Sequence, residues 1–290
     1  MHGMTMTVAR RAWTYFEPIH AIVYFAPGAP ERFKAAGLRG GWMGYFASRS
    51  APMGAVSPGV VTAVFYNFHP AMVARAIPDA WQYSSPELAL TARTAVADSA
   101  LRRLWGDEIA SAEIAAAAST TMELASRLRG GGRPLYTATA ALDVLDVPHL
   151  KLWQACTRLR EHRFDGHVSA LTVHGLDGLE SLITIVASGA AIDAATMRRF
   201  RGWSDEEWDA GVERLRSRGI LDGAGELTDQ GHALRAAIEE TTDHLAGDVW
   251  ESMDAGEGED LFGSLRRLAT LLEAPDGIGY PNPIGLERPA

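Results

Sequence analysis

The strongest constraint on the fold is a run of patterns in the order helix, helix, hairpin, helix in the C-terminal half of the chain. Two helices are expected over Thr196–Phe200 and Ser204–Arg218, the second opening with a capping box. Residues 220–227 (ILDGAGEL) indicate two short strands around a glycine-rich turn. A last helix is expected from Thr228 to about Leu245. This order is that of a winged helix, which we therefore predict here.

The rest of the chain is also expected to be helical, since apolar residues recur at helical spacing along most of it. We predict a mainly α fold, a helical body with a C-terminal winged helix. The glycines at 130–132 are the clearest linker. The expected organisation is a helical domain over residues 1–130, a helical plus winged-helix part over 134–273, and an irregular tail over 274–290. Long helices are expected over Thr7–Phe25, Pro86–Leu104, Asp107–Leu128, Pro148–His162 and Phe164–Val173, and Gly166 indicates a break near the junction of the last two.

An internal repeat would make the two halves pseudo-symmetric. The tetrapeptides Gly37–Gly40 (GLRG) and Gly175–Gly178 (GLDG) are each followed by an Ala-Ser pair and then by a helix, turn and helix pattern. If the repeat is real, both halves are winged-helix-like, and Phe65–Leu104 should superpose on Phe200–Leu245. The alternative is chance similarity, because the identities are sparse and one stretch needs a gap.

Composition narrows the classes of function. The formal net charge is −9, which opposes a broadly phosphate-binding surface. Cys156 is the sole cysteine, so neither an internal disulfide nor a cysteine-based zinc site is expected. No apolar stretch reaches the roughly 18 residues of a membrane span, and the N-terminus lacks the pattern of a signal peptide. We therefore expect a cytoplasmic protein with no membrane partner.

Two histidines interrupt apolar runs and lie near carboxylates. Glu17 and His20 share one face of an aromatic helix, and His167 follows Glu161 and Asp165 in a charged segment. Buried polar groups need partners, so we expect both imidazoles on one cavity wall between the halves, within about 10 Å. Such a set could act as general acid and base, or bind a divalent metal through His20, His167 and Glu17. The alternatives are a hydrogen-bonded core pair and an ordinary charged helix end.

Aromatic residues of the first half are a second group of candidates. They could line a ligand pocket, although core packing explains the same pattern. The candidate pocket residues are Tyr24, Trp42, Tyr45, Phe65 and His69.

The expected winged helix is poorly charged for reading DNA. Its second helix opens with four acids among residues 205–209 (DEEWD), where a recognition helix would meet base edges and phosphates. The wing turn, residues 222–226 (DGAGE), is acidic as well. Arg198, Arg199 and Arg201 are the only useful basic patch. Specific duplex binding is therefore disfavoured.

Four stretches carry a resemblance that covers nearly the whole chain: EPIHAIVYFAP (17–27), GLRGGWMGYFASRSAP (37–52), LREHRFDGH (159–167) and RGWSDEEW (201–208). On these the chain resembles an actinobacterial SalK-like family to which a MarR-like winged helix is assigned. The resemblance implies an all-helical body with a winged-helix unit, and a role with small molecules in secondary metabolism. The acidic second helix and wing depart from what DNA reading requires.

These observations lead to two main hypotheses of function, beside the plainer option of a catalytically inert partner protein. The first is a small-molecule-binding protein, an enzyme of secondary metabolism that uses the His/carboxylate site between two halves with or without a divalent metal. The alternative is a ligand-responsive MarR-like winged-helix transcriptional regulator, in which the same cavity holds an effector. The sequence identifies neither substrate nor cofactor, and it is compatible with a monomer or a homodimer.

Overall fold

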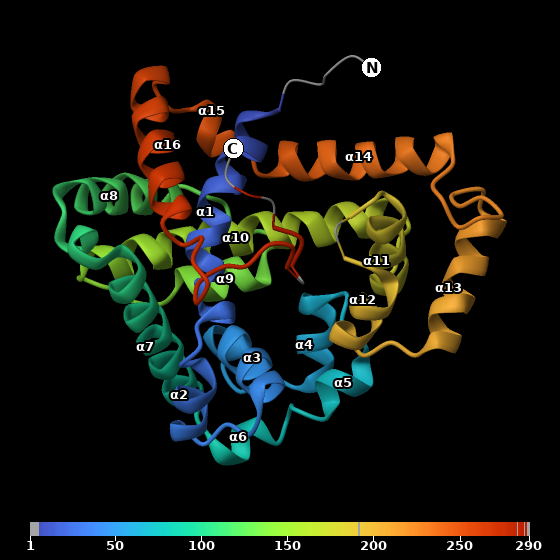
Figure 1. The fold of residues 1–290 in the computed structure, drawn as a ribbon, viewed down its shortest axis with the longest axis horizontal. Coiled ribbons are helices and arrows are strands. Elements are labelled where there is room, and N and C mark those ends of the chain that lie inside the picture. Colours follow the sequence, from blue (N-terminus) through green and yellow to red (C-terminus); the bar gives the residue numbers. More distant parts are fainter. Residues whose placement is uncertain (1–5, 191, 283, 287, 289–290) are drawn as a thin grey trace.

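The computed structural model describes residues 6–288 except 191, 283 and 287. In this part the chain is mainly helical, as predicted, and no strand is formed. Helices pack around a long central helix, with the winged-helix unit at one end of the molecule (Figure 1). The α-helices are α1 (Val8–Phe25), α2 (Ala29–Ala35), α3 (Gly41–Ser50), α4 (Pro58–Phe65), α5 (Pro70–Ala74), α6 (Ala80–Tyr83), α7 (Pro86–Trp105), α8 (Ala112–Ser126), α9 (Pro134–Ala140), α10 (Pro148–Val173), α11 (Gly178–Ala187), α12 (Ala194–Arg201), α13 (Asp205–Ser217), α14 (Asp229–Leu245), α15 (Asp248–Glu251) and α16 (Ala255–Thr270).

The central helix α10 is longer than the sequence pattern suggested. It runs without interruption for 26 residues, so the break expected at Gly166 is wrong. The reason is a close approach: a Cβ at Gly166 would meet the guanidinium of Arg133 at 2.3 Å. This glycine makes room for a neighbour inside a helix rather than ending it. Helices α1, α8, α9 and α14 all pack on α10, with α1 crossing it and α14 running along it (Figure 1).

Buried apolar side chains form two clusters. The larger occupies the helical body and includes Phe16, Phe46, Leu101, Leu152 and Leu268. It therefore spans residues on both sides of the boundary expected at 130–134. The smaller cluster lies within the winged-helix unit and is built from α11 to α14 together with the C-terminal end of α10.

The winged-helix unit has the predicted order of helices but a reduced wing. Gly202 ends α12 in a left-handed conformation with φ of 80°, and the predicted capping box of Ser204 and Glu207 begins α13. The two predicted strands are wrong, because only a single bridge between Leu221 and Leu227 forms. The turn between them is held by a side chain, since the Asp222 carboxylate accepts the backbone N–H groups of residues 224 and 226.

The two glycine tetrapeptides build the same local structure. Gly37 and Gly175 both have positive φ and follow the last turns of a helix, and the next residues, Leu38 and Leu176, are each 1% exposed. In both places the leucine N–H donates to the carbonyl five residues earlier, which is a Schellman arrangement. Superposition of the two halves stays a prediction.

Within the described residues no single helix is both long enough and apolar enough to cross a membrane. Helices α10 and α11 would reach that length and composition only when taken together, and they are bent by 95° at their junction.

Candidate functional site

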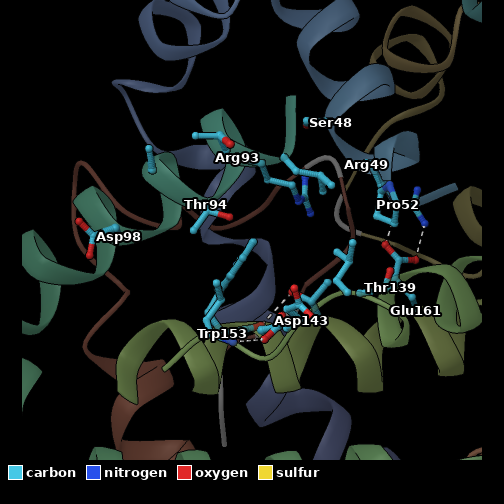
Figure 2. A pocket seen from close by; sticks show the side chains of 17 residues that line it. Ser48, Arg49, Pro52, Arg93, Thr94, Asp98, Thr139, Asp143, Trp153 and Glu161 are labelled. Atoms are coloured by element: carbon cyan, nitrogen blue, oxygen red, sulfur yellow. Dashed lines mark hydrogen bonds and ion pairs between the residues drawn. The ribbon is translucent and has the colours of Figure 1, made fainter. Parts of the chain in front are cut away.

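A cavity of about 460 Å³ lies in the helical body between α3, α7, α9 and α10. Figure 2 shows Arg93 and Ser48 on the α7 and α3 side, across from Trp153 and Glu161 of α10. Exposed Thr91 and Asp143 mark the side on which the cavity meets solvent. The volume is in the usual range for small-molecule sites. The lining residues are Ser48, Arg49, Pro52, Leu90, Thr91, Arg93, Thr94, Ala95, Asp98, Thr139, Leu142, Asp143, Leu145, Trp153, Gln154, Thr157 and Glu161.

A buried cluster of two arginines and two glutamates forms one side of this region. Arg49 donates to both carboxylate oxygens of Glu161 at 2.9 Å, in a bidentate pair whose side chains are 2% and 3% exposed. Arg160 bridges Glu161 at 2.9 Å and Glu17 at 3.2 Å. Burial opposes the charge of Glu161, but Arg49 and Arg160 hold the pKa of this carboxyl far below its usual range. Glu161 and the two arginines therefore stay ionised at neutral pH.

A directional chain of hydrogen bonds leads from the cavity wall to His20. The Thr157 hydroxyl donates to the Trp153 carbonyl at 2.8 Å, so at 3.0 Å it accepts the Nδ1 proton of His20. The Nε2 atom of His20 is then an acceptor, and it receives the Tyr24 hydroxyl at 3.1 Å. Tyr24 in turn accepts from Arg93 at 3.0 Å. Complete burial, and then Arg160, keep the pKa of His20 well below 6.5, so the imidazole is neutral.

Two donors on the cavity wall lack a matching group among the described residues. Arg93 is 5% exposed, yet in the described part of the chain no carboxylate pairs with it. Its contacts are the Tyr24 hydroxyl and the rings of Tyr24 and Trp153, 5.1 and 5.8 Å from its central carbon. The Ser48 hydroxyl is buried and has no hydrogen-bond partner among the described residues. Both groups line the cavity.

Of the predicted chemical residues, only Glu161 lines the cavity, while Glu17 and His20 lie behind its wall. His167 belongs to a different network, where it bonds Thr242 of α14 at 2.9 Å, and burial first of all lowers its pKa to about 4. Its helix position is ten residues from Thr157, the partner of His20, or about 15 Å along α10. The structure thus does not form the expected shared wall of two imidazoles.

Asp165 is separate again. Its carboxylate accepts the Tyr136 N–H at the start of α9 at 2.9 Å, and burial raises its pKa to about 7. Glu17 is bonded by Trp13 and Arg160 rather than by a histidine. No three His, Cys, Asp or Glu side chains among the described residues are arranged to hold a metal ion.

The predicted pocket aromatics do not line the cavity. Trp42, Tyr45 and Phe65 pack with Phe46, Phe68 and Phe200 in an aromatic cluster between the body and α12. Tyr24 touches this cluster through Tyr45, with ring centroids 5.2 Å apart. The alternative interpretation of these residues as core packing is the one the structure supports.

His69 lies at a seam between the body and the winged helix. Its Nδ1 accepts the Ala71 N–H at the start of α5, so Nε2 carries the proton and donates to Glu207 of α13 at 2.9 Å. Its backbone N–H donates to the Arg201 carbonyl at 2.8 Å. The Trp203 indole completes the seam by donating to the Asn67 carbonyl at 3.0 Å. Three bonds therefore fix the turn between α12 and α13 against residues 67–69.

The arginines considered for DNA contact differ in what they face. Arg198 pairs with Asp205 at 2.7 Å, and Arg201 is buried with its guanidinium 4.7 Å from the Phe68 ring. Arg199 is exposed. The exposed acids Asp205 and Glu206 stand at the start of α13, as the sequence suggested.

Sequence reasoning missed Arg93, Arg49 and Ser48. A signal for Arg93 was present, because it shares a helical face with Ala89, Val96, Ala97 and Ala100, all buried. A charged residue on such a face needs a partner or a ligand. Ser48 and Arg49 gave a similar signal, because they are buried polar residues near the end of the apolar segment of residues 41–50.

No curated protein and no solved structure matches the chain. A family model described as a helix-turn-helix family matches residues 9–277, which include both the cavity and the winged-helix unit. The match extends over most of the chain, so the protein belongs to this helix-turn-helix family.

Proposed function

We propose that the protein is a ligand-responsive winged-helix regulator that binds a small-molecule effector in the cavity of the helical body. Membership of the helix-turn-helix family supports the regulatory part of this proposal. The cavity supports the effector part, since it has a suitable volume and unsatisfied donors. Such a regulator would act in the cytoplasm. The link to secondary metabolism rests on the SalK-like resemblance.

The observation that carries the proposal is a continuous path of contacts from the cavity to α12. Arg49 lines the cavity and donates to the Tyr45 hydroxyl at 3.1 Å. The Tyr45 ring lies 5.5 Å from that of Phe68, which in turn faces the Arg201 guanidinium. A ligand bound beside Arg49 would therefore act on groups that hold the helix-turn-helix against the body.

The negative charge of α13 would limit how strongly the protein binds DNA. Asp205, Glu206 and Asp209 are exposed there and would repel phosphates. Arg199 is the exposed cation of α12. We therefore expect weak duplex binding that depends on Arg199 and improves when acids of α13 are neutralised.

Selection from a random pool of duplexes at about 0.15 M salt tests the regulatory function directly. Enrichment of one sequence motif, weakened by Arg199→Ala and strengthened by Glu206→Gln with Asp209→Asn, would support it. Glu240→Gln, at an exposed acid of α14, is the matched control and should have no effect. If no motif is enriched, or if all variants behave alike, DNA reading by this helix is wrong.

A second candidate is an enzyme acting on a small molecule in the same cavity. One observation favours it: Thr157 lines the cavity and accepts the proton of His20, whose other nitrogen accepts from Tyr24. These bonds hold a neutral imidazole directly behind the cavity wall, in the form that can accept a proton. The enzyme would be favoured over the regulator if duplex selection yields no motif while the cavity binds small molecules.

A further inference from the structure

We infer that the cavity takes an organic anion: a small molecule with one acidic group bound by Arg93 and Ser48 and an apolar part against Trp153. This inference deepens the proposed function, on which it rests for the role of the ligand. It names the chemical class that the lining would recognise.

The first argument is the balance of buried charge. Among the described residues, Glu161 and Glu17 pair with Arg49 and Arg160, whereas no carboxylate pairs with the buried guanidinium of Arg93. His20 is neutral and cannot change the sum. One positive charge is therefore uncompensated, and it lies at Arg93. A buried cation is costly without a counter-charge, so an anionic ligand beside Arg93 would be stabilised by it.

The second argument is that Arg93 and Ser48 face the same space. Each is at most 5% exposed, each lines the cavity, and neither has an acceptor that satisfies it fully. Figure 2 shows both side chains on the wall opposite Trp153. A carboxylate or similar group would supply the missing acceptor oxygens to both.

Two acidic residues also line the cavity, but neither neutralises Arg93. Asp98 is bonded to Arg102 at 2.9 Å and to His149 at 2.7 Å, so its charge is already compensated. Asp143 is exposed, where water screens its charge. One guanidinium without a carboxylate, that of Arg93, matches one negative charge, which limits the class to monoanions.

The remaining lining residues indicate what the uncharged part of the ligand is like. Leu90, Leu142, Leu145 and the ring of Trp153 offer apolar contact, and the Gln154 amide is already bonded to the backbone of residues 143 and 145. The cavity volume of about 460 Å³ suits a compact aromatic or short aliphatic acid.

Matched pairs of acids and neutral amides test the class by calorimetry: benzoate with benzamide, phenylacetate with phenylacetamide, and hexanoate with hexanamide. We expect each acid that binds to do so about 10- to 100-fold more tightly than its amide, as a charge-assisted hydrogen bond requires. Arg93→Gln should abolish that preference. Ser48→Ala should weaken the acids by about 3- to 10-fold. Arg103→Gln, at an exposed arginine of the same helix that pairs with Asp276, is the control and should bind like the wild type.

Amides that bind as tightly as acids, acids unaffected by both Arg93→Gln and Ser48→Ala, or acids that show no binding up to about 10 mM would each overturn the inference. Unfolding curves of every variant establish that it is folded. If Arg93→Gln does not fold, Ser48→Ala still tests the inference. Failure here is distinct from failure of the proposed function. Acid binding without a DNA motif would leave the inference standing, and a DNA motif with amide preference would leave the regulator standing.

Discussion

Arginine–carboxylate pairs hold both the helical body and the winged helix together, but in opposite surroundings. The Arg49–Glu161 pair has side chains 2% and 3% exposed, whereas those of Arg198 and Asp205 are 23% and 78% exposed. Water solvates the second pair whether or not it is made, so its net contribution is small. In the body each charge relies on its partner, because no water replaces a missing one. The same residue types therefore fix a unique arrangement at Arg49–Glu161 and contribute little at Arg198–Asp205.

The largest effect should follow from Glu161→Gln. This change leaves Arg49 and Arg160 buried without their shared carboxylate, and we expect a loss of about 3–5 kcal/mol in the free energy of unfolding. Urea denaturation at pH 7 measures it. Glu213→Gln, which removes an exposed partner of Arg216, is the control and should cost no more than about 0.5 kcal/mol. A loss below about 1 kcal/mol for Glu161→Gln would show that the buried cluster is not what we describe.

The next effect concerns Asp165, a buried carboxyl of the body that lacks an arginine partner. Its pKa is raised to about 7, above the unfolded value near 3.8. Between these values the folded state holds a proton that the unfolded state releases, so this group lowers stability as pH rises from about 4 to about 7. Asp165→Asn keeps the acceptor for Tyr136 and should raise stability by about 2–4 kcal/mol at pH 8, with no change at pH 4.

Unfolding of Asp165→Asn and wild type across pH 4–8 checks the sign of this effect. Asp209→Asn, at an exposed acid of α13, is the control. Its difference from the wild type in the free energy of unfolding should not change with pH over the same range. A stabilisation that is equal at both ends of the range would mean that the charge of Asp165 plays no part.

A smaller effect on stability should distinguish substitution of Arg93 from substitution of Arg49 within the body. Arg49 has a carboxylate partner and Arg93 has none among the described residues, although both are buried. Arg93→Met should therefore leave the ligand-free protein equally stable or more stable by about 1 kcal/mol, whereas Arg49→Met should destabilise it. Thermal unfolding without ligand tells the two apart. If both changes destabilise alike, Arg93 has a structural role and the argument for a ligand anion weakens.

The long amphipathic helices could be predicted because their pattern is local. The helix expected over Thr7–Phe25 is α1 with Thr7 as its cap, and the last winged-helix element is α14 with Thr228 as its cap. The break predicted at Gly166 is wrong because the small size of this residue serves a contact with Arg133, which is 33 residues earlier in the sequence. The wing was overestimated because strand pairing depends on a partner, which the Asp222 turn does not supply beyond one bridge.

The candidate site could be predicted only in part. Glu161 could be predicted because it lies in a charged segment rich in acids and histidines. Its partner Arg49 could not be predicted in the same way, because it is 112 positions away in the sequence. His20 was recognised correctly as a polar residue in an apolar helix, and its need for a partner was met by Thr157 and Tyr24 rather than by His167. Spacing along one helix reveals that a partner is required, and only the packing of helices decides which one.

The smallest effect should come from the exposed pairs of the winged helix. Arg198→Gln removes the partner of Asp205, and we expect a loss of about 0.2–1 kcal/mol at low salt. At about 1 M salt the Debye length is near 3 Å, so the loss should disappear. The effect of Glu161→Gln should persist under the same conditions, because ions do not reach a pair that is 2% and 3% exposed. Urea denaturation of both variants at low and high salt therefore compares the two regions directly. Equal salt dependence would mean that exposure does not separate the body from the winged helix, whereas a salt-sensitive loss for Arg198→Gln alone would confirm that it does.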